Sequence, residues 1–150
     1  MSLMPPIMPG MLRDDELTLV FTSFSPHQFH RVPAYHFLMM HAATTEEMGR
    51  INLRTVTSHA IEHYAGHIGY TVHEAFRGHR YAARAVRLLM PLARQLHIQP
   101  LWITCDPANI PSRRSCEIAG AEFVETIYLP PQYGGYALGQ RQKCRYRLET

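Results

Sequence analysis

The stretch Gly66-His-Ile-Gly-Tyr-Thr-Val72, followed by Arg77-Gly-His-Arg-Tyr-Ala82 and an amphipathic segment to Leu96, decides the fold of this chain. Residues 66–72 predict a strand, because β-rich side chains alternate with Ile68, Tyr70 and Val72 on one face. Residues 82–96 predict a helix, because apolar side chains recur three and four positions apart. The sequence therefore predicts a strand, a short loop and a helix in succession.

The loop between these two elements holds one glycine and three basic side chains. A loop that opens a helix can point several backbone N–H groups at one place, and the helix dipole and nearby cations favour an anion there. We therefore expect a phosphate or pyrophosphate site at residues 77–82. Its members are Arg77, Gly78, His79, Arg80, Tyr81 and Ala82.

Composition predicts one folded domain over residues 1–150, with 46% apolar and 18% charged residues. We find no apolar run long enough for a bilayer and no signal-peptide pattern, and the three cysteines favour reduced thiols and a cytoplasmic protein. The net charge of +3 argues against charge-driven nucleic-acid binding. Residues 1–12 are expected to form a flexible tail, and Met1-Ser2-Leu3 is compatible with a native start or a cloning remnant.

The remaining strands follow from alternating or β-branched segments. We predict seven strands, at residues 17–24, 35–40, 50–56, 66–72, 100–105, 121–129 and 143–148. Short links favour an antiparallel meander at the start, and the strand–helix–strand unit favours a right-handed parallel crossover. Asn109 is expected to cap a second helix that ends at Gly120. Pro91 predicts either a kink or two shorter helices.

With these elements in place, Arg77-Gly78-His79-Arg80-Tyr81-Ala82 resembles the acyl-CoA pyrophosphate loop of the GNAT acyltransferases, written Q/R-x-x-G-x-G/A. Arg80 stands where that pattern normally has Gly, so its side chain must point away or hold the phosphate itself. Downstream, Asn109-Ile-Pro-Ser112 resembles the N-x-x-S/A segment of the same family, in the same order. Segments 49–54 and 66–70 are similar to an uncharacterised bacterial subgroup of that family.

The resemblance implies an α+β fold, with a mixed, mostly antiparallel twisted sheet of about seven strands that is splayed in the middle, and two main helices. It implies an N-acetyltransferase that moves an acetyl group from acetyl-CoA, its co-substrate, to an amine by direct attack in a ternary complex. The acceptor would be a small-molecule or peptide amine, with no nucleic acid, membrane or metal involved. Homodimers are frequent in the family, and the last strand is a candidate interface.

The resemblance also implies where the coenzyme lies. The strand from Gly66 would part from the strand 101–105, and its free edge would pair with the pantetheine arm. Gly69 would form a bulge that aims the backbone N–H of Tyr70 or Thr71 at the thioester oxygen, although close packing alone also explains a glycine there. Further coenzyme contacts are expected at Tyr70, Thr71, Val72, Asn109 and Ser112.

The catalytic groups are less clearly marked in the sequence. Many GNAT enzymes carry, seven residues after the Asn, a Tyr that protonates the leaving thiolate, and this chain has Cys116 there. A thiol pKa of about 8.5 allows that role. Alternatively, Cys116 is a small buried hydrophobe, and water or Tyr128 serves instead. The candidate bases are Glu62, His63 and His67, each of which also suits a surface or turn position.

Two other functions fit parts of the sequence. His59-Ala-Ile-Glu62-His63 matches the H-x-x-E-H pattern of one group of zinc peptidases, which needs both histidines on one helical face and a third ligand. The Arg80 substitution and the missing tyrosine are also compatible with a module that binds acyl-CoA without turnover. Acceptor specificity is expected to depend on residues 25–33 and 130–139, which we predict to be loops.

Overall fold

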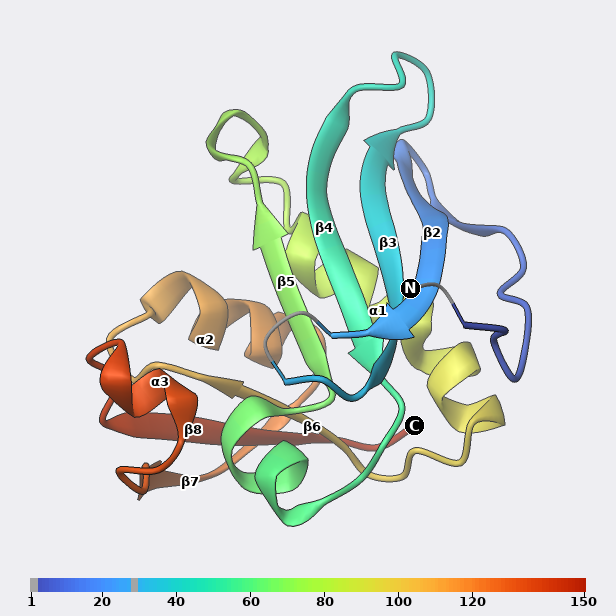
Figure 1. Cartoon of the computed structure of the whole chain (residues 1–150). Coiled ribbons are helices and arrows are strands. Elements are labelled where there is room, and N and C mark those ends of the chain that lie inside the picture. Colours follow the sequence, from blue (N-terminus) through green and yellow to red (C-terminus); the bar gives the residue numbers. More distant parts are fainter. Residues whose placement is uncertain (1–2, 28–29) are drawn as a thin grey trace.

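In the computed structural model of the chain, which describes residues 3–27 and 30–150, the strands form two antiparallel sheets (Figure 1). The first sheet has the order β1-β2-β3-β4-β5, with β1 Leu12–Asp14, β2 Leu17–Pro26, β3 Pro33–His41, β4 Glu47–Arg54 and β5 Ile68–Val72. The second has the order β6-β8-β7, with β6 Leu101–Cys105, β8 Gln142–Leu148 and β7 Glu122–Tyr128. The mixed, mostly antiparallel α+β fold is confirmed, with one strand more than the seven predicted.

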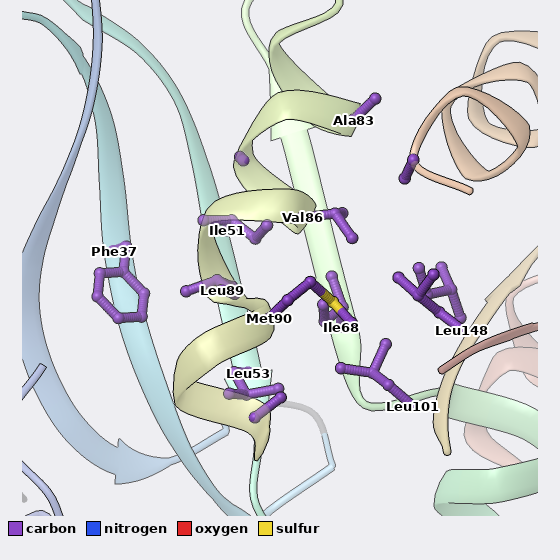
Figure 2. Close-up of a cluster of buried hydrophobic side chains, with 14 of the residues drawn as sticks. Phe37, Ile51, Leu53, Ile68, Ala83, Val86, Leu89, Met90, Leu101 and Leu148 are labelled. Atoms are coloured by element: carbon purple, nitrogen blue, oxygen red, sulfur yellow. The ribbon is translucent and has the colours of Figure 1, made fainter. Parts of the chain in front are cut away.

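The helices are α1 Tyr81–Gln95, α2 Ile110–Ile118 and the short α3 Gly134–Ala137, with a π-helix η1 Ile61–Ala65 and a 3-10 helix η2 Glu74–Phe76. Helix α1 covers one face of the first sheet. Leu89 and Val86 pack there with Ile51 and Leu53 of β4 and Phe37 of β3 (Figure 2). Because side chains alternate along a strand, the neighbouring β4 residues face the other side of the sheet. None of the helices in the described ranges is long and apolar enough to cross a membrane.

Helix α1 runs unbroken through Pro91, so the alternative of two shorter helices is wrong. Pro91 and Arg87, whose carbonyl would have accepted the missing hydrogen bond, are both exposed. Water can therefore hydrate that carbonyl, while Val86, Leu89 and Ala93 keep the apolar side buried.

The two sheets part between β5 and β6. Within the described residues β5 pairs only with β4, and β6 pairs only with β8. The strands meet at one end, where the backbone N–H of His67 donates to the Trp102 carbonyl at 2.7 Å and the Trp102 N–H donates to His67 Nδ1 at 2.9 Å. In Figure 1 the strands of the second sheet run across the lower end of β5. The result is a V-shaped gap that opens toward Val72, as the family resemblance implied.

The described part of the N-terminal segment does not hang free, contrary to the flexible tail expected at residues 1–12. Leu12 begins β1, and the Ile7 backbone exchanges hydrogen bonds of 3.1 and 2.7 Å with the hydroxyl of Tyr35. Pairing of β1 with β2 and the hydrogen bonds to this buried hydroxyl hold the segment in place. Both contacts involve residues distant in the sequence, so the segment's own residues do not predict them. Met1 and Ser2, and with them most of the predicted start, lie outside the described residues.

Other predictions are also corrected or refined. Gly69 is not a bulge, because β4 and β5 pair in unbroken register from Leu53↔Ile68 to Gly49↔Val72. The link at residues 58–64 contains η1, and the loop at 130–139 contains α3. The last strand, β8, lies between β6 and β7 in its sheet, so it offers a face and not an edge, and the homodimer interface stays a prediction. The predicted loop at 25–33 shortens to residues 27–32, of which 28 and 29 are outside the described part.

Candidate active site

A cavity of about 570 Å³ lies where the two sheets part. Its wall comes from the edge of β5, the loop before α1, the first turn of α1 and the start of α2. Except for His79, every coenzyme-contact residue predicted from the sequence lines it: Tyr70, Thr71, Val72, Arg77, Gly78, Arg80, Tyr81, Ala82, Asn109 and Ser112. Phe76, Pro111 and Ser115 also line the cavity, and the motifs did not point to them.

The loop between η2 and α1 presents a set of unpaired backbone N–H groups. The first hydrogen bond of the helix runs from the Arg84 N–H to the Arg80 carbonyl at 2.9 Å. In the ranges 3–27 and 30–150, the N–H groups of residues 78–83 have no hydrogen-bond acceptor. A helix start leaves such donors free for a ligand, and the helix dipole adds positive potential there. The donors suit an anion.

Two residues give this loop its shape. Gly78 has a φ of +93°, and no heavy atom lies within 4 Å of a Cβ built there. Arg80, the residue before α1, has a φ of +62°. A left-handed conformation at this position explains why the family pattern has glycine there, and it costs an arginine about 1–2 kcal/mol. Arg80 is exposed and lines the cavity.

The N-terminal end of α1 is fixed to the β1–β2 turn by an ion-pair network. Arg84 Nε donates to Asp14 Oδ2 at 2.7 Å, and Arg84 Nη2 donates to Glu16 Oε1 at 2.6 Å. The hydroxyl of Tyr81 donates to Glu16 Oε2 at 2.9 Å. Hydrogen bonds from Arg84 and then Tyr81 lower the pKa of Glu16 to about 2. The network holds the loop amides in place without using any of them.

The hydrogen-bond pattern of β5 shows which backbone groups face the gap. The Arg54 N–H donates to the His67 carbonyl at 2.7 Å, and the His73 N–H donates to the Met48 carbonyl at 2.8 Å. In an antiparallel pair these bonds alternate, so odd-numbered residues of β5 face β4 and even-numbered ones face away from it. The N–H of Tyr70 is therefore directed toward the gap, and that of Thr71 toward β4.

Helix α2 closes the cavity on its other side. Asn109 caps the helix as predicted, since its Oδ1 accepts from the Ser112 N–H at 3.2 Å. The Tyr70 hydroxyl reaches α2, where it lies 2.9 Å from Ser112 Oγ, 3.3 Å from the Ser112 carbonyl and 3.8 Å from Cys116 Sγ. Burial raises the pKa of Tyr70 above its ordinary value, so the phenol stays protonated and can donate a hydrogen bond.

Comparison with known proteins agrees with this geometry. The sequence model described as "Acetyltransferase (GNAT) domain" matches residues 4–122, which include the loop and the Asn109 segment. The chain belongs to the GNAT acetyltransferase family. No curated protein matches it.

Solved structures of GNAT proteins share the fold. They include the GNAT-family acetyltransferase from Bacillus anthracis (18% identity, TM-score 0.59, 76% of this chain and 65% of that one) and the ribosomal-protein-S5-alanine acetyltransferase from Vibrio fischeri (15% identity, TM-score 0.60, 77% and 61%). A third is the microcin C7 self-immunity acetyltransferase MccE, solved with acetyl-CoA and AMP (16% identity, TM-score 0.59, 78% and 61%). The chain spans less than two thirds of the length of each.

The position where many GNAT enzymes have a catalytic tyrosine is closed off from the cavity in this chain. Cys116 is 1% exposed and is absent from the cavity wall. Contact with Cys105 and burial raise the pKa of the Cys116 thiol. Tyr70, whose hydroxyl lies 3.8 Å from the Cys116 Sγ, does line the cavity. All three cysteines are buried and unbonded to one another, as the reduced state requires.

The candidate bases of this GNAT domain lie away from the coenzyme cavity. His67 is fully buried, and its ring nitrogens contact the Trp102 N–H and Thr57 Oγ1, the latter at 3.0 Å. Glu62 and His63 both lie in η1, and neither lines the cavity. The structure therefore brings the predicted coenzyme residues together but not the predicted bases.

The zinc-peptidase pattern also falls on η1. Its two histidines do share one helical side, since the rings of His59 and His63 stack with centroids 4.1 Å apart. His59 Nε2 lies 3.3 Å from the Tyr64 hydroxyl, and His63 Nδ1 lies 3.0 Å from the His59 carbonyl. Across the described residues, no group of three His, Cys, Asp or Glu side chains could hold a metal ion. Nothing else in the structure favours a zinc hydrolase.

Proposed function

We propose that this GNAT domain is an N-acetyltransferase that transfers an acetyl group from acetyl-CoA to an amine by direct attack in a ternary complex. One observation carries the proposal: residues 78 and 80–82, whose N–H groups are unpaired, and the unpaired edge of β5 line the same cavity. Amides at a helix start suit a diphosphate, and a free strand edge suits a chain of amides. Acyl-CoA carries both a diphosphate and a chain of amides.

The residues present fit the coenzyme part by part. The amides of residues 78–83, with Arg77 and Arg80, would hold the pyrophosphate. The Arg77 Nε already donates to the Val72 carbonyl at 3.2 Å, so its side chain bridges the loop and the strand edge. Backbone groups of Tyr70 and Val72, with Asn109 and Ser112, would hold the pantetheine arm. MccE, solved with acetyl-CoA, supports this assignment as a relative of the same fold.

Bound acetyl-CoA would supply an acetyl group activated as a thioester. The acceptor nitrogen forms a bond to the carbonyl carbon, the C–S bond breaks, and the sulfur leaves with the electron pair. The N–H of Tyr70 is the backbone donor placed to stabilise the carbonyl oxygen as it gains charge. The nitrogen loses a proton and the leaving thiolate gains one, so no further reactant is consumed.

We propose that the hydroxyl of Tyr70 donates the hydrogen bond that stabilises the leaving thiolate. Cys116, the acid expected from the sequence, lies 3.8 Å behind that hydroxyl and has no surface in the cavity. Tyr128, the other alternative, is 79% exposed on the edge strand β7. Glu62 stays a prediction as the base, acting through water, because no contact links its side chain to the cavity.

Thermal-shift measurements with CoA and acetyl-CoA test the binding half of the proposal. A ligand at a hundred times its Kd stabilises the fold by about 2.7 kcal/mol, which raises Tm by several degrees. Thiol release with a panel of amines, amino acids and peptides then tests transfer. Binding without thiol release would favour the module that holds acyl-CoA without turnover, and no shift at saturating acetyl-CoA would refute both functions.

A further inference from the structure

A second cavity, of about 350 Å³, lies on the face of the first sheet opposite α1. Its wall includes His36 of β3 and Arg50 and Asn52 of β4, together with Ser23 and Ser25 of β2. These side chains alternate with Phe37 and Ile51, which face α1. The cavity is therefore a polar hollow in the open face of the sheet, and none of the functions described so far uses it.

The strand register places this cavity beside the edge that faces the coenzyme. Arg50, Ile51 and Asn52 of its wall pair with Thr71, Tyr70 and Gly69 of β5. Tyr70 and Thr71 line the coenzyme cavity. Neighbouring strands are about 4.8 Å apart, so the second cavity lies one strand away from the Tyr70 N–H and at the same level of the sheet.

Gly69 allows Asn52 and Arg54 to pack closely over β5. A Cβ at this position would lie 2.9 Å from Arg54 Nη2 and 3.2 Å from Asn52 Nδ2. The missing side chain therefore lets Asn52 lean over β5 toward the gap. This close packing, and not a bulge, is the physical reason for a glycine in the middle of the strand.

Asn52 has an unsatisfied acceptor. Its Oδ1 is buried and has no hydrogen-bond partner among the residues that the structure describes. A buried acceptor without a donor is costly, and such atoms in native proteins call for an explanation. An amine supplies N–H donors that would satisfy this oxygen, and the buried Arg54 guanidinium, whose Nη2 would lie 2.9 Å from a Cβ at Gly69, favours the neutral form of that amine.

The charges around the cavity indicate what else the ligand carries. No carboxylate belongs to the wall, whereas Arg50 does, and its side chain is 70% exposed. The nearest carboxylate to Arg50 is Glu47, at 3.7 Å, and Glu47 is also hydrogen-bonded to His73. Arg50 can therefore bind a carboxylate or phosphate on the ligand, bidentately and at little cost to existing contacts.

We infer that the second cavity is the acceptor site, and that the acceptor is a small amine bearing an anionic group. The amine nitrogen binds Asn52 Oδ1 beside Gly69, and the anionic group binds Arg50. This inference rests on the proposed acetyl transfer for the role of the amine, but the binding site itself does not depend on turnover.

The test is a titration of the full-length chain, alone and with CoA, with γ-aminobutyrate and n-butylamine, followed by amide NMR. The two probes share an amine and a similar length, and only the first has a carboxylate. We expect γ-aminobutyrate to shift the backbone amides of residues 50–52 and the Asn52 side-chain amide. We expect n-butylamine to bind about tenfold more weakly. Shifts confined to other surfaces, or none with either probe, would overturn the inference.

Two variants of one residue complete the test. Asn52→Leu removes the acceptor at similar volume and should weaken γ-aminobutyrate binding at least about tenfold, whereas Asn52→Asp keeps the oxygen and should bind at least as well as the native chain. Gln95→Leu, an exposed change at the end of α1, is the matched control for folding and solubility. Unchanged binding by Asn52→Leu would refute the site. Acetyl-CoA binding by the same variants reports separately on the proposed function.

Discussion

The two cavities of this protein are built from different parts of the chain. The coenzyme cavity presents backbone groups, the N–H donors of residues 78 and 80–82 and the edge of β5. The second cavity presents side chains, those of His36, Arg50 and Asn52 among them. Backbone donors recognise what all acyl-CoA molecules share, while side chains can change without altering the fold. If the two proposals hold, the coenzyme is bound mainly by backbone groups that the fold fixes, and the acceptor is bound by individual side chains.

The largest effect is expected from changing the backbone on the coenzyme side. Gly78→Val places a β-branched residue at a φ of +93°, which would reshape the loop and displace its amides. Strain of about 1–3 kcal/mol and lost hydrogen bonds to a charged group should weaken acetyl-CoA binding at least about a hundredfold. Isothermal titration calorimetry with acetyl-CoA measures the change.

Gly139 supplies the control, because it also has a φ of +93° and open space around its Cβ position. Gly139→Val should cost similar stability and leave acetyl-CoA binding unchanged. Equal losses of binding in the two variants would mean that the loop amides have no special role.

A smaller effect is expected at the point where the coenzyme cavity uses a side chain. Tyr70→Phe keeps the ring and the backbone N–H but removes the hydroxyl near Ser112 and Cys116. We expect kcat to fall between about tenfold and a hundredfold with little change in KM for acetyl-CoA, because the leaving thiolate loses a hydrogen-bond donor in the transition state. Steady-state thiol release measures both constants.

Cys116→Ala is the paired experiment. Since its thiol is buried behind Tyr70, this variant should keep most of the turnover. A large loss of kcat in Cys116→Ala with native turnover in Tyr70→Phe would return the acid role to the cysteine.

A still smaller effect is expected at Arg80. Its backbone conformation lowers the stability of the fold, whereas its charged side chain should strengthen acetyl-CoA binding. Arg80→Gly should raise the free energy of unfolding by about 1 kcal/mol, because glycine adopts a φ of +62° without strain. Loss of the cation should weaken acetyl-CoA binding by about fivefold. Urea unfolding and calorimetry measure the two quantities.

Arg31, with a φ of +58°, offers the comparison, since Arg31→Gly should give the same gain in stability and no change in binding. A stability loss in Arg80→Gly would show that the left-handed arginine is not strained.

The smallest effect concerns the network that fixes α1. The pKa of Glu16 is about 2 in the folded chain and about 4.5 when unperturbed, so its contribution to stability is complete above pH 4.5. It should be lost as the pH falls through 2. Urea unfolding of the native chain and Glu16→Gln should therefore converge over this window. A constant difference down to pH 2 would mean that Glu16 does not pair with Arg84 in solution.

The coenzyme side was predictable from sequence because its structure is local. The loop conformation follows from Gly78 and the start of an amphipathic helix, and the Asn109 cap follows from its own side chain. To predict the coenzyme cavity from the loop and the capped helix, only the gap between β5 and β6 had to be added. The family resemblance implied that gap. Alternation likewise identified the long strands, since each buries one face.

Most features that the sequence did not predict depend on contacts between residues far apart in the chain. β1 has three residues and exists through its pairing with β2. Gly69 looked like a bulge, because nothing in its own strand shows that Asn52 and Arg54 lie over it. Helix α3 contains two glycines, which are poor helix formers, so its sequence favours a loop. The second cavity combines three strands whose register no single segment encodes.

The vertex of the V is held by the side chain of His67 as well as by a backbone hydrogen bond. Because His67 Nδ1 accepts from the Trp102 N–H, its proton must be on Nε2, which then donates to Thr57. Burial and the charge of Arg54 lower the pKa of His67 to about 4, so the imidazole stays neutral near neutral pH. A neutral imidazole therefore joins the two sheets at this point. Below pH 4, a second proton on Nδ1 would displace the Trp102 N–H, and this hydrogen bond between the sheets would be lost.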